Sequence, residues 1–138
     1  MRIYLIDNEL IVTKTIHSFL KDLGYDVVSF NSISEFLSTK KSEDVFVDVI
    51  IVDLKMPKEN GIKIIAEIHK KYPNADIIVM SSILPFHKAF SYSVYSYLKK
   101  PIHFDELELI LARISERHRN IELDLQKNLR GFGSIYNP

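Results

Sequence analysis

The chain alternates short apolar runs with stretches whose apolar residues recur at helical spacing, and this alternation constrains the fold more than any other feature. Several runs are continuous and rich in β-branched residues, which is typical of strands buried on both faces. The runs are IYLI (3–6), VVSF (27–30), VIIV (49–52), IIVM (77–80) and YSYL (95–98). Five strand–helix units in succession predict a doubly wound α/β fold, in which a parallel sheet carries helices on both faces.

Local signals agree with this alternation. Apolar spacing predicts helices over 12–23, 33–37, 62–72, 86–93 and 107–114. Gly24 and Pro73 stand where the first and third helices should end, and Ser32 stands where the second should be capped. None of the four glycines forms a phosphate-binding loop, which argues against a nucleotide-binding fold.

The composition is that of one globular domain. A chain of 138 residues can bury a sizeable core. The 18 Lys and Arg balance the 18 Asp and Glu, so the whole chain offers no electrostatic attraction to nucleic acid or an anionic membrane. The absence of cysteine excludes disulfides and thiolate chemistry. The apolar runs are too short for a membrane span or a signal peptide, so we expect a cytoplasmic protein.

Polar side chains stand where four of the five predicted strands end. They are Asp7, Asn8 and Glu9 after the first run, Asp53 after the third, Ser81 after the fourth and Lys100 after the fifth. The carboxyl ends of parallel strands lie at one edge of the sheet, where α/β proteins bind ligands. Carboxylate oxygens suit Mg²⁺, and a hydroxyl and an ammonium suit a phosphoryl group. Each residue taken alone is better explained as a loop, capping or surface residue, but the four strand ends together predict a phosphoryl site.

At these residues the sequence resembles the receiver domain of bacterial two-component response regulators. The motifs that carry the resemblance are LIDNE, IIVDLKMPKENG, IIVMSS and YLKKP, within a stretch from about 2 to 117. The resemblance implies a flavodoxin-like (βα)5 fold with strand order 2-1-3-4-5. It also implies a place in a histidine-to-aspartate phosphorelay, with a sensor histidine kinase or phosphotransfer protein as the partner.

The resemblance assigns roles to individual residues. Asp53 would be the phosphoacceptor and form an acyl phosphate. Lys100 would contact a phosphoryl oxygen, and Ser81 and Tyr97 would form the switch that relays phosphorylation. Pro101 would follow a cis peptide bond. No enzymatic activity is expected beyond self-phosphorylation from a phosphodonor and self-dephosphorylation.

The same resemblance implies Mg²⁺ as the cofactor. Its ligands would be Asp7, Asn8, Asp53 and the backbone carbonyl of Lys55. Asn8 departs from the family pattern, because the second acidic residue of the first strand is usually the direct metal ligand. An amide oxygen can still ligate, so we expect a present but weakened metal site. A second departure is Ser93-Val94, which stands in place of the family's small Gly-Ala pair.

Two other functions compete with phosphorylation. Haloacid-dehalogenase-type phosphatases also form an aspartyl phosphate, but they need a carboxylate two residues after the nucleophile. Glu9 follows Asp7 at this spacing, whereas Lys55 follows Asp53, and no cap domain or matching downstream pattern supports a phosphatase. An unphosphorylated receiver-like binding module is the other alternative, and Asn8 is its best argument. The retention of the phosphoacceptor, hydroxyl and ammonium positions favours phosphorylation.

The sequence continues beyond the receiver pattern. We expect a receiver domain over 1–117 and a C-terminal helical extension or linker over 118–138. Residues at alternating spacings of four and three suggest a coiled-coil seam: Leu107, Leu111, Ile114, His118, Ile121, Leu125, Asn128 and Phe132. The seam is imperfect, because His118 and Asn128 are polar. Gly131 and Gly133 would end the helix. The alternatives are a homodimer through this seam or one long helix with a frayed end.

Such an extension resembles the linker helix of transcription regulators whose receiver precedes an ATPase module and a DNA-binding module. No output module lies within these residues, and we expect them to make no contact with nucleic acid or membrane. The chain is therefore either a fragment of such a regulator or a single-domain regulator that works through partner binding.

Overall fold

The computed structural model describes residues 1–41, 46–55, 58–82 and 94–136, without the side chains of 58–60 and 131–136. It contains a five-stranded, all-parallel sheet with the order β2-β1-β3-β4-β5. The strands are β1 (Arg2–Ile6), β2 (Asp26–Phe30), β3 (Val49–Asp53), β4 (Asp76–Ser81) and β5 (Ser96–Lys99). The predicted doubly wound fold and its strand order are confirmed.

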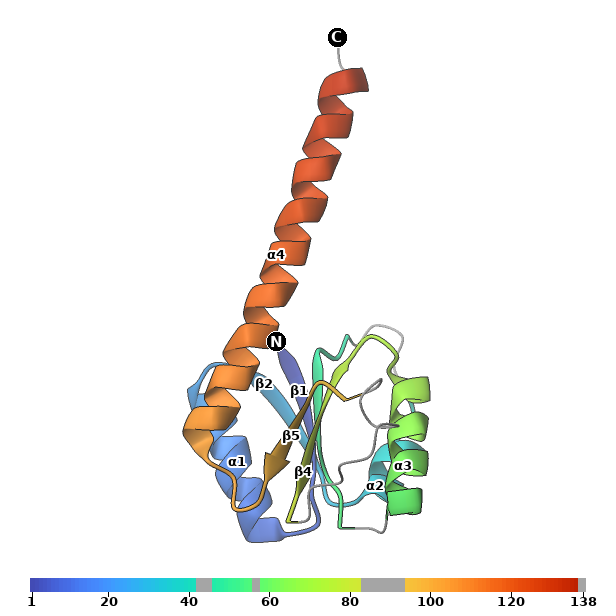
Figure 1. Cartoon of the computed structure of the whole chain (residues 1–138), viewed down its shortest axis with the longest axis vertical. Helices are drawn as coiled ribbons and strands as arrows, with labels where there is room; N and C mark the ends of the chain where they lie inside the picture. The colour runs from blue at the N-terminus through green and yellow to red at the C-terminus, as the bar shows by residue number, and fades with distance from the viewer. Residues whose placement is uncertain (42–45, 56–57, 83–93, 137–138) are drawn as a thin grey trace. The chain divides into compact units, whose positions relative to one another are not determined.

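Helices cover both faces of this sheet (Figure 1). The described helices are α1 (Leu10–Asp22), α2 (Ile33–Ser38), α3 (Lys58–Lys71) and α4 (Phe104–Tyr136). Helix α1 lies on one face, and α2 and α3 lie together on the other. The helix predicted over 86–93 lies outside the described residues, as does Ser93 of the Ser93-Val94 pair.

Contacts divide the chain into two compact units, Met1–Ile102 and His103–Pro138. The first unit holds the whole sheet with α1, α2 and α3. The second consists of the 33-residue helix α4, which confirms the expected extended C-terminal helix. This helix continues to Tyr136, so the expectation that Gly131 and Gly133 would end it was wrong. The domain boundary at residue 117 stays a prediction.

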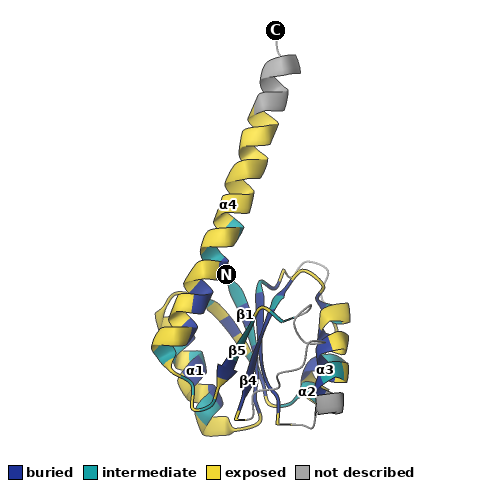
Figure 2. Ribbon diagram, viewed as in Figure 1, coloured by how far each residue is buried: buried dark blue, intermediate teal, exposed yellow. Residues whose placement is uncertain are grey.

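The two central strands explain why the sheet needs helices on both faces. All five residues of β3 and all but the first of β4 are buried (Figure 2). Continuous burial matches the unbroken VIIV and IIVM runs, because each successive side chain points to the opposite face. In β1, Ile6 pairs with Phe30 of β2 on one side and Val52 of β3 on the other.

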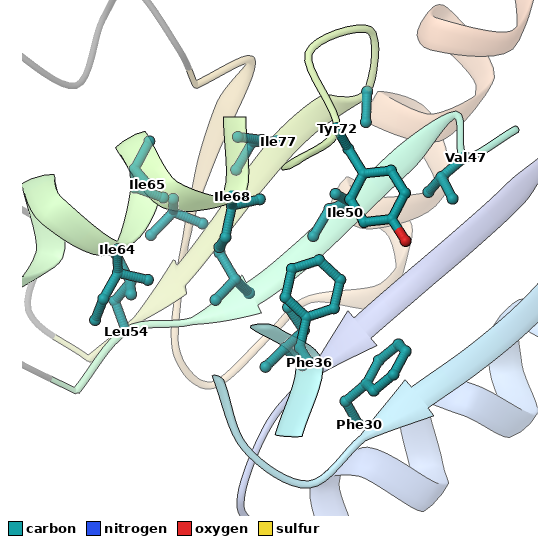
Figure 3. Close-up of a cluster of buried hydrophobic side chains, with 14 residues drawn as sticks. Phe30, Phe36, Val47, Ile50, Leu54, Ile64, Ile65, Ile68, Tyr72 and Ile77 are labelled. Carbon is teal, nitrogen blue, oxygen red and sulfur yellow. The ribbon is translucent and has the colours of Figure 1, made fainter. Parts of the chain in front are cut away.

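A hydrophobic core cluster, which includes the rings of Phe30, Phe36 and Tyr72, fills the space between the sheet, α2 and α3 (Figure 3). The rings of Phe30 and Phe36 meet edge to face with centroids 5.2 Å apart, and Tyr72 lies 5.7 Å from Phe36. Lys71 Nζ donates hydrogen bonds to the backbone oxygens of Phe36 (2.8 Å) and Leu37 (3.2 Å). Lys71 thereby caps the carboxyl end of α2 and links it to α3.

The predicted local signals are present. Gly24 follows α1 with φ of 93°, a conformation that glycine adopts without a Cβ clash, and its N–H donates to the Lys21 carbonyl at 2.9 Å. Ser32 caps α2 by accepting a hydrogen bond from the Glu35 N–H at 3.0 Å. Glu35 in turn accepts one from the Asn31 N–H at 2.8 Å. Each helix of the described chain is too short or too polar to span a membrane.

The acidic site at the carboxyl edge of the sheet

Side chains from the ends of three strands meet at the carboxyl edge of the sheet. Asp7 directly follows β1, Asp53 ends β3 and Lys100 directly follows β5. Both carboxylates are buried, with relative exposures of 2% for Asp7 and 7% for Asp53. Lys100 Nζ lies 2.8 Å from Asp53 Oδ2 and 3.5 Å from Asp7 Oδ2. One ammonium therefore bridges the two buried carboxylates.

Backbone hydrogen bonds hold Asp7 in place. Its N–H donates to the Phe30 carbonyl at 3.1 Å, and Oδ1 accepts from the Glu9 N–H at 2.9 Å. The Thr13 hydroxyl lies 3.2 Å from the Asp7 carbonyl and donates to it. Because Oδ1 is used in the turn that leads into α1, Oδ2 is left to face Lys100.

The sheet ladder positions Asp53 and Lys100 in the same way. The Leu54 N–H donates to the Met80 carbonyl at 2.9 Å, directly after Asp53. The Lys100 N–H donates to the Ser81 carbonyl at 2.9 Å. The Lys100–Pro101 peptide bond is cis. Both functional side chains thus leave the sheet at its last ladder hydrogen bonds.

Opposing effects act on the ionisation of the Asp53 carboxyl. Burial raises its pKa, and the negative charge of Asp7 raises it further, whereas the Lys100 ammonium lowers it. The net direction is upward, because burial disfavours the charged carboxylate more than Lys100 favours it. A second positive charge beside this carboxylate would therefore be favourable.

Lys55 brings a second ammonium to the site. Its Nζ lies 2.6 Å from Glu9 Oε1, 2.8 Å from Asn8 Oδ1 and 3.8 Å from Asp53 Oδ2. The hydrogen bond from Lys55 and the charges of Lys100 and Lys55 lower the pKa of the Glu9 carboxyl. From the sequence, only the backbone carbonyl of Lys55 was expected at this site, and Glu9 was named at the strand end without a ligand role.

The buried oxygens fit a small hard cation. In the described part of the chain, Asp7 Oδ2, both Asp53 oxygens and Lys100 Nζ are buried without an aligned hydrogen bond, so their contacts are ion pairs. Mg²⁺ binds through one or two carboxylates and keeps several waters. Within the same residues no three His, Cys, Asp or Glu side chains converge as ligands, so backbone or water oxygens must complete the shell.

A cavity of about 230 Å³ opens beside these oxygens. It lies between the ends of β1 and β3 and the start of α2. Its lining residues are Ile6, Asp7, Asn8, Ser32, Ile33, Ser34, Asp53 and Lys55. The cavity leaves the Asp53 carboxylate accessible to a small polar ligand from this side.

The two predicted switch residues lie on β4 and β5. Ser81 is buried at the end of β4, one residue beyond Met80, which pairs with Asp53 in the sheet. Tyr97 is half-buried, pairs with Val79 and packs against the core cluster, and burial raises the pKa of its hydroxyl. Both residues lie near the polar edge, but their part in a switch stays a prediction.

Solved structures resemble this fold over most of its length. A response regulator receiver domain protein from Clostridium thermocellum is 27% identical, with a TM-score of 0.73, over 87% of this chain and 98% of the other. Response regulator protein TrrA from Thermotoga maritima is also 27% identical, with a TM-score of 0.67, over 82% of this chain and 97% of the other. That protein was solved in complex with Mg²⁺-BeF.

Similar curated proteins are regulators that are longer than this chain. The probable C4-dicarboxylate response regulator DctR of Halalkalibacterium halodurans is 26% identical over 91% of this chain and 56% of its own length. The transcriptional regulatory protein GlrR of Escherichia coli is 33% identical over 75% of this chain and 23% of its own length. The chain therefore spans a little more than half of the length of DctR and less than a quarter of the length of GlrR.

The family comparison covers most of the chain. Residues 3–112 match the family described as the response regulator receiver domain. This range contains all five strands except Arg2 of β1, and it contains every residue of the acidic site. The chain therefore belongs to the response regulator receiver domain family.

Proposed function

We propose that this domain accepts a phosphoryl group on Asp53 from a histidine of a sensor kinase or phosphotransfer protein. The observation that carries the proposal is the buried Asp53 carboxylate with Lys100 Nζ 2.8 Å from Oδ2. A carboxylate oxygen attacks phosphorus while the phosphorus–nitrogen bond breaks, and the bond's electron pair leaves with the histidine ring. The product is an aspartyl phosphate, and the ring is released neutral after protonation.

The two oxygens of Asp53 have different surroundings that suit this reaction. Oδ2 is paired with Lys100, whereas no side chain pairs with Oδ1 among the described residues. Oδ1 is therefore the nucleophile that we assign. Lys100 favours the ionised carboxylate, which opposes part of the effect of burial, and it remains beside the site to meet a phosphoryl oxygen.

We assign Mg²⁺ as the cofactor and Asp7, Asp53 and the Lys55 carbonyl as its protein ligands. Asn8 would contribute its amide oxygen and a weaker grip than a carboxylate. Bound Mg²⁺ supplies positive charge where negative charge accumulates during phosphoryl transfer. The buried oxygens of Asp7 and Asp53 that no hydrogen bond satisfies support this assignment, as does the Mg²⁺-BeF complex of TrrA.

Phosphorylation would be relayed through Ser81 and Tyr97. Phosphorylation adds negative charge and three strong acceptor oxygens, which a nearby hydroxyl can meet. Ser81 stands one strand away from Asp53 at the same edge, and Tyr97 follows on the next strand. A movement of Ser81 toward the phosphoryl group would open space for Tyr97 to turn further inward.

The output would be regulation of transcription through a homodimer. Relatives such as GlrR are named as transcriptional regulatory proteins, and this chain matches only part of their length. Residues 118–138 would act as a linker whose apolar seam pairs with a second copy. Ile121 and Leu125 of this seam are 53% and 59% exposed, which leaves them available for pairing. A phosphorelay partner of this kind would place the domain in the cytoplasm.

Mass spectrometry of the intact protein tests the phosphoacceptor. The parent should gain one phosphoryl group after incubation with acetyl phosphate and Mg²⁺, and Asp53→Asn should gain none. An adduct on Asp53→Asn would overturn the assignment. A parent that gains no phosphoryl group from acetyl phosphate or from a phosphorylated histidine protein would favour the alternative, an unphosphorylated binding module, for which Asn8 is the supporting observation.

A further inference from the structure

The side chain of Lys55 lies among the oxygens that the proposed metal site would use. Its Nζ lies 2.8 Å from Asn8 Oδ1 and 3.8 Å from Asp53 Oδ2, and both oxygens belong to the proposed metal site. Its shortest contact is 2.6 Å to Glu9 Oε1, on the outer side of that site. Oxygens of Asn8, Glu9 and Asp53, from the carboxyl ends of β1 and β3, thus lie around the Lys55 ammonium.

An ammonium and Mg²⁺ cannot share these oxygens without strong repulsion. Mg²⁺ binds oxygens at about 2.0–2.1 Å, so a metal on Asp53 and Asn8 would lie within a few ångströms of the Lys55 charge. Like charges at such distances repel strongly near a protein surface. Because Asn8 carries no charge, it can relieve none of this repulsion.

We propose that the Lys55 ammonium is a tethered cation that competes with Mg²⁺, so that metal binding requires the Lys55 side chain to leave the acidic site. This inference rests on the proposed function only in its placement of the metal. The backbone carbonyl of Lys55 remains a metal ligand, while its side chain holds the metal-free site in a charge-balanced state.

The exposure of Lys55 makes the competition reversible. The Lys55 side chain is 40% exposed, and that of its main partner Glu9 is 47% exposed. Ion pairs with this exposure contribute little to stability and weaken further in salt. Lys100 differs, since its side chain is only 15% exposed and contacts the two buried carboxylates. Lys55 is therefore the ammonium that yields to the metal.

Mg²⁺ titrations of the whole chain by NMR test the competition. Lys55→Met keeps a long side chain without charge and should bind Mg²⁺ about 3- to 10-fold more tightly than the parent. Lys55→Arg restores the charge and should return the affinity toward that of the parent. Lys21→Met is the matched control, because Lys21 is an exposed lysine at the far end of α1 and should leave the affinity unchanged within about twofold.

Thermal melts give a second readout that does not depend on phosphorylation. In chelator Lys55→Met should melt below the parent, because the acidic site loses a compensating charge. Saturating Mg²⁺ should raise its melting temperature by more than it raises that of the parent. Equal or weaker Mg²⁺ binding by Lys55→Met overturns the proposal, and so does a failure of both proteins to bind Mg²⁺.

The same proteins separate this inference from the proposed function. If the parent gains no phosphoryl group but Lys55→Met binds Mg²⁺ more tightly, phosphorylation is overturned and the competition stands. If Asp53 is phosphorylated but the two Mg²⁺ affinities are equal, the competition is overturned and the phosphoacceptor stands.

Discussion

Lys100 Nζ lies 2.8 Å from Asp53 Oδ2, so the two residues form a largely buried ion pair across the carboxyl ends of β3 and β5. Lys100→Met leaves Asp53 beside Asp7 without this cation. We expect a loss on the order of 3 kcal/mol in the free energy of unfolding at pH 7 in chelator, because removing one partner of a buried pair leaves an uncompensated charge. Urea denaturation measures this difference.

Lys99→Met is the matched control for this experiment. Lys99 is the preceding residue, is exposed and has no contact with either carboxylate among those found in the described chain. It should change the free energy of unfolding by less than about 0.5 kcal/mol. Equal losses in both variants would mean that the strand, and not the ion pair, is sensitive to substitution.

The raised pKa of Asp53 predicts how stability changes with pH in chelator. A carboxyl whose pKa is higher in the folded state binds its proton more tightly there, so the folded state loses stability as that proton is released. The loss begins near the ordinary Asp pKa of about 4 and is complete above the raised pKa of the folded state. Asp53→Asn has no such proton and should gain stability relative to the parent across this range.

Denaturation curves at several pH values in chelator check this prediction. The stability advantage of Asp53→Asn should be small at about pH 4 and larger at pH 7. Saturating Mg²⁺ should reverse the comparison, because the parent has a cation to pair with its carboxylate. An advantage that is the same at both pH values would show that Asp53 ionisation does not limit stability.

Asn8→Asp should tighten Mg²⁺ binding. The added carboxylate contributes roughly 1–2 kcal/mol after desolvation, or about tenfold in affinity. The gain should be larger in the Lys55→Met background, because Lys55 also pairs more strongly with a carboxylate than with an amide. In chelator the variant should be less stable than the parent, because the Lys55 ammonium is already paired with Glu9 and does not fully balance a further carboxylate beside Asp7 and Asp53. Mg²⁺ titration by NMR and thermal melts in chelator measure these quantities, and equal affinities would place Asn8 outside the metal shell.

Much of the fold and of the site was predictable from the sequence, because strand order and strand ends follow from simple rules. Continuous burial of β3 and β4 could be read from their β-branched runs, and the parallel arrangement brought Asp7, Asp53 and Lys100 to one edge. The beginning of α3 was less predictable. It starts at Lys58, four residues before the predicted start. Asn60 and Gly61 have low helix propensity, which argued against a helix there, but the tertiary structure overrides this propensity.

The side chain of Lys55 could not be placed from the sequence. A long lysine beyond a strand end can reach solvent or turn back over the site, and only the tertiary structure decides between them. Here Asn8 and Glu9, which are 46 or more residues away in the chain, supply the oxygens that hold it. In the sequence, Asp7 and Glu9 flank the amide of Asn8. These two close negative charges were the available signal that a cation from another part of the chain balances them.

The exposed part of α4 allows a sharp test of dimerisation. Leu125 lies on the predicted seam, whereas Leu123 lies about 200° away around the helix at 100° per residue. Both side chains are exposed, by 59% and 54%, so neither substitution by Asp should unfold a monomer. We expect Leu125→Asp to shift the protein from dimer to monomer in sedimentation equilibrium and Leu123→Asp to leave it dimeric.

Truncation after Arg117 should also give a folded monomer. If the parent is itself a monomer, or if both leucine variants remain dimers, the seam is not the interface, and α4 is one long unpaired helix or part of a contact with another protein.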